Sequence, residues 1–304
     1  MLRRFSLLAL VSALALTVSS CQKESPLGSQ DNPVKLYFTP SVDADTITQN
    51  SDEFVKFLEK ETGLYFKTGI PASFVAVVEA FGSERADIGV MNSFGYIMAN
   101  EKYGAEAKLR VIRYGHDYYQ GVILARSDAG IEKLSDLQGK KFAFTDPSST
   151  SGYMFPKKMI QEAGVELGEH VFAGKHDSVV TMIYQGQVEA GSAYYSAPAE
   201  DGTIRDARSR VITQFPDVAE KVKIVAITDK IPNDPFVFRK GLSPEITKKF
   251  IAAVKKYLET DEGKTVFKNI YSVDGLVEAT DADYQGLRQT LEAINVNPAE
   301  LLSK

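Results

Sequence analysis

Hydrophobic and polar positions along this chain alternate between short apolar runs and longer amphipathic stretches. Residues 34–38 form an apolar run with little polar interruption, as in a strand of a sheet that is covered on both faces. A polar loop over residues 40–50 follows. Residues 52–62 then place apolar side chains at positions 54, 55, 57 and 58, the spacing of an amphipathic helix that Gly63 ends. This succession of strand and helix predicts parallel βαβ units.

The same patterns predict elements over the rest of the chain. Strands are expected at residues 64–67, 87–90, 109–114, 122–125, 141–144, 171–173, 188–195 and 222–227. Helices are expected at residues 74–81 (capped by Ser73), 92–98, 135–139, 153–163, 176–184 and 197–208. Beyond Pro235 the pattern changes to three successive helices, at residues 244–258, 261–270 and 284–294. We therefore expect an α/β fold with two doubly wound lobes.

Length and charge limit what such a fold can do. The chain has 304 residues, enough for two domains of ordinary size. Hydrophobic residues make up 44% and charged residues 25%, a normal composition for a globular protein, and the net charge is −5. Such a chain offers no broad attraction for nucleic acid or for anions in general. Any anion site is therefore expected to be local, built from dipoles and hydroxyl groups.

The N-terminal residues indicate export and a lipid anchor. Two arginines precede an apolar run at residues 5–18 and a small-residue stretch, which together predict a signal peptide over residues 1–20. Cys21 follows directly and is the only cysteine, so no intramolecular disulfide can form. The sequence around it resembles a bacterial lipobox and predicts lipidation of Cys21. The alternative is an ordinary signal peptide with an incidental cysteine. Residues 21–32 are polar and predict a flexible, lipid-anchored tether.

A turn rich in hydroxyl groups stands between a predicted strand and the helix that follows it. It contains Ser149, Thr150 and Ser151, followed by Gly152. The first N–H groups of a helix lack partners and carry partial positive charge, so neighbouring hydroxyls complete a cradle for a tetrahedral oxyanion. The alternative is a plain helix cap, which needs a single hydroxyl.

Three motifs occur together in the order Ser149-Thr150-Ser151-Gly152, Gly174-Lys175-His176-Asp177 and Ile231-Pro232-Asn233-Asp234-Pro235. With these motifs, the chain resembles the phosphate, phosphite and phosphonate substrate-binding proteins of ABC transporters over about residues 34–293. The resemblance implies the two-lobed periplasmic-binding-protein fold of type II. Lobe one would comprise residues 33–119 and 230–304, and lobe two residues 120–229. Two crossovers would join the lobes, which would close on a ligand in the cleft by hinge bending.

The resemblance also implies which side chains of lobe two hold the ligand. The hydroxyls of Ser149, Thr150 and Ser151 would bind the oxyanion, and His176, at a second predicted helix start, would donate to it. No histidine pair has the spacing of a metal-binding helix, so no metal or cofactor is expected.

Lobe one is expected to add further donors. Tyr119, at the first crossover, would donate through its phenol, and its neighbour Tyr118 is the alternative match. A second tyrosine of the family is replaced here by Phe74, which removes a donor. Asn92 and Ser93, at another predicted helix start, could replace it.

The acidic residues bear on which anion is bound. The resemblance implies that Asp234 faces the cleft, although an aspartate in a turn is common without any such role. A carboxylate beside an anion needs a proton between them, so Asp234 would accept from a P–OH group or an amine. Aminophosphonate binders carry a second acid where this chain has Tyr194, Tyr195 and Ser196, which argues against an amine-bearing ligand.

The sequence thus predicts a binding protein rather than an enzyme. No arrangement of Ser, His and Asp residues and no Gly-rich nucleotide loop suggests catalysis. The expected partners are a phosphorus oxyanion, an ABC transporter permease and, through the lipid anchor, the membrane, with the protein acting as a monomer. Two alternatives remain, because a fold does not fix a function: an enzyme on the same two-lobed fold, or a sensor that signals through a membrane partner.

Overall fold

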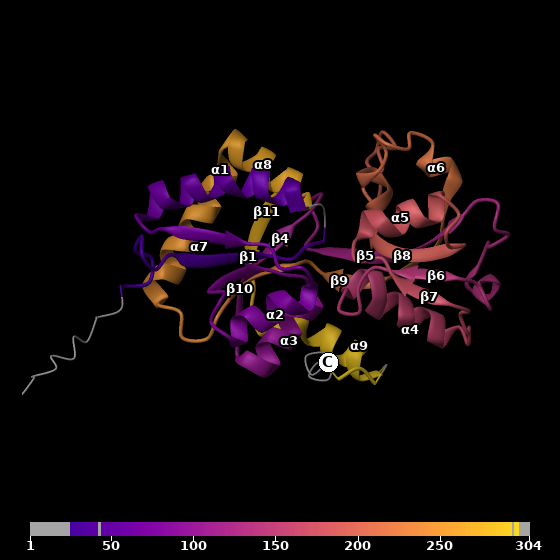
Figure 1. Ribbon diagram of the computed structural model, residues 1–304, viewed down its shortest axis with the longest axis horizontal. Helices are drawn as coiled ribbons and strands as arrows, with labels where there is room; N and C mark the ends of the chain where they lie inside the picture. The colour runs from indigo at the N-terminus through magenta and orange to yellow at the C-terminus, as the bar shows by residue number, and fades with distance from the viewer. Residues whose placement is uncertain (1–24, 42–43, 294, 298–304) are drawn as a thin grey trace, which may run out of the picture.

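The computed structural model describes residues 25–41, 44–293 and 295–297 of the chain (Figure 1). The predicted signal peptide and Cys21 lie outside the described residues, so cleavage and lipidation stay predictions. Within the described ranges, none of the helices has the length and apolar character needed to cross a bilayer.

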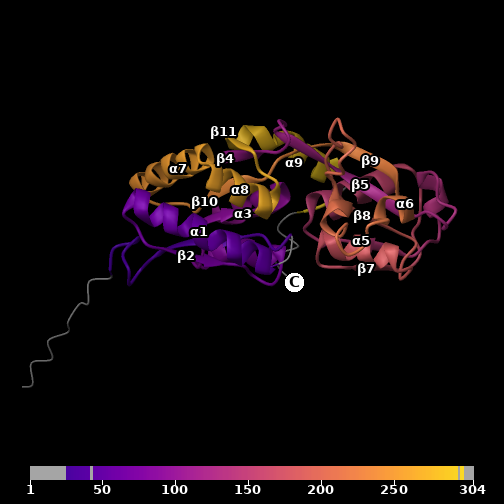
Figure 2. The same ribbon diagram turned by 90° about the horizontal axis from the view of Figure 1, so that it is seen from above.

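The chain folds around two β-sheets that share no strand, each at the centre of its own lobe (Figures 1 and 2). The first sheet has the strand order β11-β4-β10-β3-β1-β2. Its strands are β1 (Val34–Phe38), β2 (Phe66–Gly69), β3 (Ile88–Val90), β4 (Glu106–Ile112), β10 (Pro235–Phe238) and β11 (Gly275–Glu278). The second sheet has the order β7-β6-β8-β5-β9. Its strands are β5 (Tyr118–Arg126), β6 (Phe142–Phe144), β7 (His170–Phe172), β8 (Ala190–Tyr195) and β9 (Val222–Pro232). The two-lobed α/β fold is therefore confirmed.

The chain passes between the sheets twice. It leaves the first sheet after β4 and enters the second at β5, and it returns between β9 and β10. The two passages lie side by side, because β5 and β9 pair with each other, for example at Tyr119 and Ile231. The exact bounds proposed for the lobes, at residues 119/120 and 229/230, stay a prediction.

The expectation of parallel βαβ units is right for only part of each sheet. β1 pairs in parallel with β2 and β3, and β6 pairs in parallel with β7 and β8. β10 runs antiparallel to β3 and β4, and β5 runs antiparallel to β8 and β9. β5 follows the first passage between lobes, and β10 follows the second. They reach their sheet without a crossover helix, and parallel pairing depends on such a helix.

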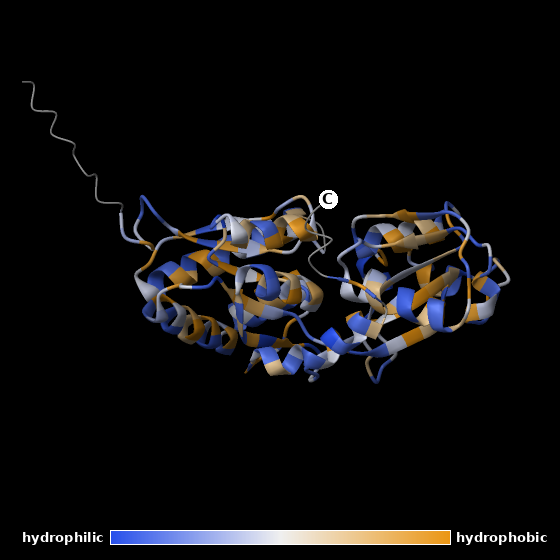
Figure 3. Cartoon of the chain, turned by 90° about the horizontal axis from the view of Figure 1, so that it is seen from below, coloured by the Kyte–Doolittle hydropathy of each residue, from blue (hydrophilic) through white to orange (hydrophobic). Residues whose placement is uncertain are grey.

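Helices cover both faces of each sheet (Figure 1). In lobe one, one face carries α1 (Ala44–Thr62), α7 (Pro244–Glu259) and α8 (Asp261–Tyr271), and the other carries α2 (Phe74–Gly82), α3 (Ser93–Tyr103) and α9 (Gln285–Ala293). In lobe two, α5 (His176–Tyr184) and α6 (Val218–Lys221) lie opposite α4 (Phe155–Glu162). Figure 3 shows hydrophobic and hydrophilic residues along the helices, as expected where one face packs on a sheet.

Aromatic and aliphatic side chains fill the space between helices and sheets. In lobe one, Phe54 of α1 packs edge-on against Phe267 of α8, with ring centroids 5.1 Å apart, and against Phe250 of α7, with ring centroids 6.4 Å apart. In lobe two, Ile183 of α5 and Ile160 of α4 are buried on opposite faces of the sheet. Burial of each such side chain stabilises the fold by about 1.5–3 kcal/mol, so each lobe is a firm support for the loops at its edge.

Several predicted elements differ from those observed. Helix α1 begins at Ala44 rather than at residue 52, so most of the predicted loop is helical. Residues 197–208 were expected to be helical, but they are irregular up to a short 3-10 turn at Ala207–Arg210. Pro198 and Gly202 explain the difference, because both residues disfavour a helix interior.

Two further differences concern strands β10 and β11 and the N-terminal part of lobe one. Strands β10 and β11 were not predicted, because three amphipathic helices dominate the sequence pattern beyond Pro235. The predicted tether reached residue 32, but Gly28 accepts a backbone hydrogen bond from Tyr65 at 2.8 Å and Leu27 packs against the core. The packed part of the chain therefore begins before the predicted end of the tether.

Candidate functional site

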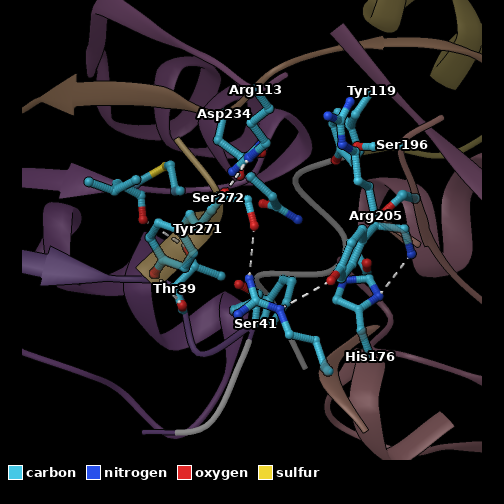
Figure 4. A pocket seen from close by; sticks show the side chains of 18 of the residues that line it. Thr39, Ser41, Arg113, Tyr119, His176, Ser196, Arg205, Asp234, Tyr271 and Ser272 are labelled. Atoms are coloured by element: carbon cyan, nitrogen blue, oxygen red, sulfur yellow. Dashed lines mark hydrogen bonds and ion pairs between the residues drawn. The ribbon is translucent and has the colours of Figure 1, made fainter. Parts of the chain in front are cut away.

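A cavity of about 60 Å³ lies between the two lobes (Figure 4). Its lining comes from both lobes and comprises Thr39, Ser41, Phe74, Val90, Met91, Asn92, Arg113, Tyr114, Tyr119, Ser149, Ser151, His176, Tyr194, Ser196, Arg205, Arg210, Asp234, Tyr271 and Ser272. A single water molecule needs roughly 10–15 Å³ of cavity volume, so the cavity has room for about four to six groups of the size of a water molecule. A tetrahedral oxyanion has this size.

The hydroxyl-rich turn follows β6 and enters the cavity from lobe two. A π-helical turn, Thr150–Met154, leads into α4, and the Ser149 hydroxyl oxygen caps it by accepting from the Gly152 N–H at 3.0 Å. Ser149 and Ser151 line the cavity. The oxygen of Ser149 is used by the cap, but its hydrogen remains able to donate, so capping and anion binding are compatible.

Thr150, Asn92 and Ser93 have other partners. The Phe94 N–H of lobe one donates to the Thr150 hydroxyl oxygen at 3.0 Å, and the Asn92 amide donates to the Ser148 carbonyl at 2.8 Å. Both bonds join the two lobes. Asn92 is part of the cavity lining, whereas Thr150 is not. The Ser93 hydroxyl donates to the Pro232 carbonyl, and Ser93 also lies outside the lining. Thr150 and Asn92 therefore connect the two lobes, whereas Ser93 binds the return passage.

His176 is placed by the start of α5 and lines the cavity as a buried side chain. Its Nδ1 accepts from the Tyr194 N–H at 3.2 Å and lies 3.2 Å from the Thr145 hydroxyl. Burial, together with repulsion from Arg210 and Arg113, lowers the pKa of His176 to about 3. The ring is therefore neutral at physiological pH. Because Nδ1 is an acceptor, the ring proton is on Nε2, which makes His176 a fixed donor.

Tyr119 begins the passage into lobe two and is buried in the cavity lining. Burial raises the pKa of its phenol well above the ordinary value, and Asp234 adds to the shift, while Arg113 and the hydroxyls of Ser151 and Thr150 oppose it. The phenol thus stays protonated and remains a donor. Tyr118, the alternative match, is not part of the lining, so the structure favours Tyr119.

Asp234 lies in the return passage and pairs with Arg113 of the outgoing passage (Figure 4). The Arg113 Nη2 donates to Asp234 Oδ2 at 2.6 Å, its Nη1 donates to the side-chain oxygen of Asn233 at 3.2 Å, and its Nε donates to the Tyr271 carbonyl at 2.6 Å. The other carboxylate oxygen, Asp234 Oδ1, is buried and has no partner in the described part of the chain. Asp234 thus contributes one unused acceptor.

Three arginines line the cavity that the sequence did not suggest: Arg113, Arg205 and Arg210. The expectation of a local site built from dipoles and hydroxyl groups did not include these positive charges. Net charge could not reveal these side chains, because local charge depends on the fold. The sole hint was the density of arginines at positions 205, 208 and 210, in the segment wrongly expected to be helical.

Other residues of the lining bear on which ligand fits. Phe74, where the resemblance led us to expect a tyrosine, contributes an apolar wall. Tyr194 and Ser196 also stand in the lining, and among its described residues Asp234 is the one acid. In the described ranges, no group of three histidine, cysteine or acidic residues is placed to hold a metal ion. The cavity therefore presents donors and cations, one free carboxylate oxygen and an apolar side.

Comparison with known proteins shows which sequences resemble this chain. A family profile, described as the periplasmic substrate-binding protein of phosphonate ABC transporters, matches residues 36–284. The phosphate-import protein PhnD of Mycolicibacterium smegmatis is 29% identical over 308 residues, which cover 93% of each chain.

Solved structures agree in fold. A binding protein component of an ABC phosphonate transporter from Pseudomonas aeruginosa has a TM-score of 0.75 at 19% identity, covering 87% of this chain and 85% of that one. PhnD1 from Prochlorococcus marinus, in complex with methylphosphonate, has a TM-score of 0.74 at 16% identity, covering 86% of this chain and 98% of that one. The expected type II binding-protein fold is confirmed. With most of its length matched by the family profile, the chain belongs to the family of periplasmic substrate-binding proteins of phosphonate ABC transporters.

Proposed function

We propose that this protein captures a small phosphorus oxyanion, such as phosphate, phosphite or a small alkylphosphonate, and delivers it to an ABC transporter permease. The observation that carries the proposal is the small interlobe cavity lined by donors and cations. A relative imports phosphate and a protein of like fold binds methylphosphonate, which supports this ligand class.

The polar groups of the cavity suit such an anion. Ser149 and Ser151 donate through hydroxyls, Tyr119 through its phenol and His176 through Nε2. Charge-assisted hydrogen bonds of this kind contribute about 1.5–3 kcal/mol each. The unused Oδ1 of Asp234 needs a proton from the ligand, and a partly protonated phosphorus oxyanion has one on its P–OH group.

Asp234 is expected to exclude sulfate. Sulfate has no proton at neutral pH, so its oxygen would face a buried carboxylate oxygen without a hydrogen bond, a contact that costs free energy. An aminophosphonate would leave ammonium protons without acceptors. Asp234→Asn replaces the acceptor by an amide that can donate, so sulfate affinity should rise by about tenfold or more. Competition titrations of wild type and variant with sulfate measure this. Wild-type protein that prefers sulfate or an aminophosphonate would show that the role given to Asp234 is wrong.

We further propose that the protein works as a monomer and releases its ligand unchanged. The passages between lobes, tied together by Arg113 and Asn233, would act as the hinge that opens and closes the cavity. Incubation with an alkylphosphonate, followed by phosphorus NMR, tests this directly. Recovery of intact ligand agrees with a binding protein, and release of inorganic phosphate would instead favour an enzyme on the same fold.

The lipid anchor is a separate part of the proposal. Cys21→Ala should prevent lipidation, so fractionation of cells should show the protein released from the membrane or left unprocessed. Because a single acyl chain gives marginal membrane affinity, the mature wild type would need more than one chain. Membrane retention of the Cys21→Ala protein with a normally cleaved N-terminus would contradict the anchor.

A further inference from the structure

The charged side chains around the cavity leave an excess of positive charge. Arg113 is neutralised by its ion pair with Asp234. Arg205 and Arg210 line the same cavity, and within the described ranges neither guanidinium has a carboxylate at ion-pair distance. Asp201 is influenced by the charge of Arg205, but it is exposed to solvent. Among the described residues of the lining, three arginines less one carboxylate leave two positive charges for a ligand to match.

Both arginines contact lobe one, although they belong to lobe two, where the Arg210 Nε also donates to the Tyr194 hydroxyl at 3.2 Å. The Arg210 Nη1 donates to the Asn269 carbonyl at 3.4 Å and its Nη2 to the Ser272 hydroxyl at 3.3 Å. The Arg205 guanidinium lies over the ring of Tyr114, 4.4 Å from its centroid. Because these contacts cross between the lobes, they fix the positive charges of Arg205 and Arg210 beside the cavity when the lobes are together.

The acceptor in the cavity adds a second condition. Asp234 Oδ1 is buried without a partner, while Oδ2 is occupied by Arg113. A ligand that matches the cavity must therefore bring one proton on oxygen for Oδ1 as well as two negative charges for Arg205 and Arg210.

We propose that the site is specific for hydrogen phosphate, the dianion of inorganic phosphate. Phosphate has three ionisable oxygens, so its dianion keeps one P–OH group. Phosphite and methylphosphonate have two ionisable oxygens each. Their dianions have no P–OH group, and their monoanions, which do, have a single charge. This inference rests on the proposed function and names its ligand, with Arg205 and Arg210 as specificity-determining residues.

The pH dependence of binding follows from the ligand's own ionisation. The groups of the lining that can titrate or carry charge are Arg113, Tyr114, Tyr119, His176, Tyr194, Arg205, Arg210, Asp234 and Tyr271. The pKa of His176 is lowered to about 3, and burial raises the pKa of Tyr119, Tyr194 and Tyr271 above the ordinary value. The dominant titration near neutrality is therefore the second ionisation of phosphate. Affinity for phosphate should rise as the dianion forms between about pH 5 and about pH 8.

The first measurement compares ligands on the full-length mature protein by calorimetry at about pH 8. Phosphate should bind about 10- to 100-fold more tightly than phosphite or methylphosphonate, because each of those leaves Oδ1 or one arginine unmatched. Arsenate, which has the same charge and proton count, should bind much as phosphate does. Binding of phosphite or methylphosphonate with an affinity equal to that of phosphate would overturn the inference while leaving the proposed function intact. Failure of every phosphorus oxyanion to bind would overturn both.

The second measurement isolates the arginines. Arg210→Gln should weaken phosphate binding by about 10- to 100-fold at about pH 8 and by less at about pH 5, where the monoanion dominates. A purely structural role in joining the lobes would lower affinity by the same factor at both pH values, and that result would contradict the inference. Arg126→Gln is the matched control, since Arg126 lies in lobe two outside the cavity and pairs with the exposed Asp128. It should leave the affinity and its pH dependence unchanged.

Discussion

Replacement of Gly152 by alanine is expected to lower affinity for the phosphorus oxyanion by about 100-fold or more. A Cβ atom at this position would lie 2.2 Å from the Thr145 hydroxyl oxygen and 2.9 Å from the Ser149 hydroxyl oxygen. Such contacts are far inside van der Waals distance, and overpacking of this kind costs about 1–3 kcal/mol. Because Thr145 and Ser149 are both buried, the site itself must shift.

That shift reaches two parts of the site at once. Thr145 contacts Nδ1 of His176 and donates to the Ser192 carbonyl at 3.1 Å, while Ser149 caps the π-helical turn. Two donors to the oxyanion are displaced, and the loss of two charge-assisted bonds gives the expected factor. Calorimetric titration with phosphate measures it. The control is Gly286→Ala in α9, where a Cβ would meet no atom within 4 Å. A Gly152→Ala protein that binds as wild type would show that the turn does not hold the ligand.

Replacement of Arg113 by methionine is expected to destabilise the folded protein by about 3 kcal/mol, since it leaves a largely buried carboxylate without its partner. Arg113 and Asp234 expose 12% and 18% of their side chains, and Arg113 also bonds to the Tyr271 carbonyl and the Asn233 amide oxygen. Denaturant unfolding measures the loss.

The double variant Arg113→Met with Asp234→Asn separates charge from packing. It should recover part of the lost stability, because the buried charge is removed along with its partner. Lys255→Met is the control for a solvent-exposed pair, since Lys255 contacts the exposed Glu278, and it should hardly change the unfolding free energy. A loss below about 1 kcal/mol for Arg113→Met would mean that the pair does not hold the passages between lobes together.

Local signals made much of the fold predictable. Helix α5 spans His176–Tyr184 as expected, because apolar residues repeat at helical spacing and Gly186 follows shortly after its end. Ser73 caps α2 as expected, with its hydroxyl oxygen accepting from the Ala76 N–H at 3.2 Å. The antiparallel direction of β10 in the first sheet and of β5 in the second sheet was not predictable in the same way. It depends on how the chain travels between lobes, and periodicity within a segment contains no such information.

Local sequence signals also made part of the site predictable. Ser149, Ser151 and His176 sit at helix starts that the sequence marks, so their place in the cavity could be anticipated. Arg205 and Arg210 lie in an irregular segment, and their approach to the cavity depends on contacts with Tyr114 and Ser272 of the other lobe. Long-range contacts of this kind have no local pattern in the sequence. They change the site from one made of neutral donors to one with an excess of positive charge.

The central claim is that the interlobe cavity binds a phosphorus oxyanion. Calorimetric titration of the mature protein with inorganic phosphate, phosphite, methylphosphonate and sulfate tests it most directly. We expect saturable binding of at least one phosphorus oxyanion at one site per chain, with sulfate far weaker. No binding of any phosphorus oxyanion, or sulfate binding as tight as the best of them, would contradict the account.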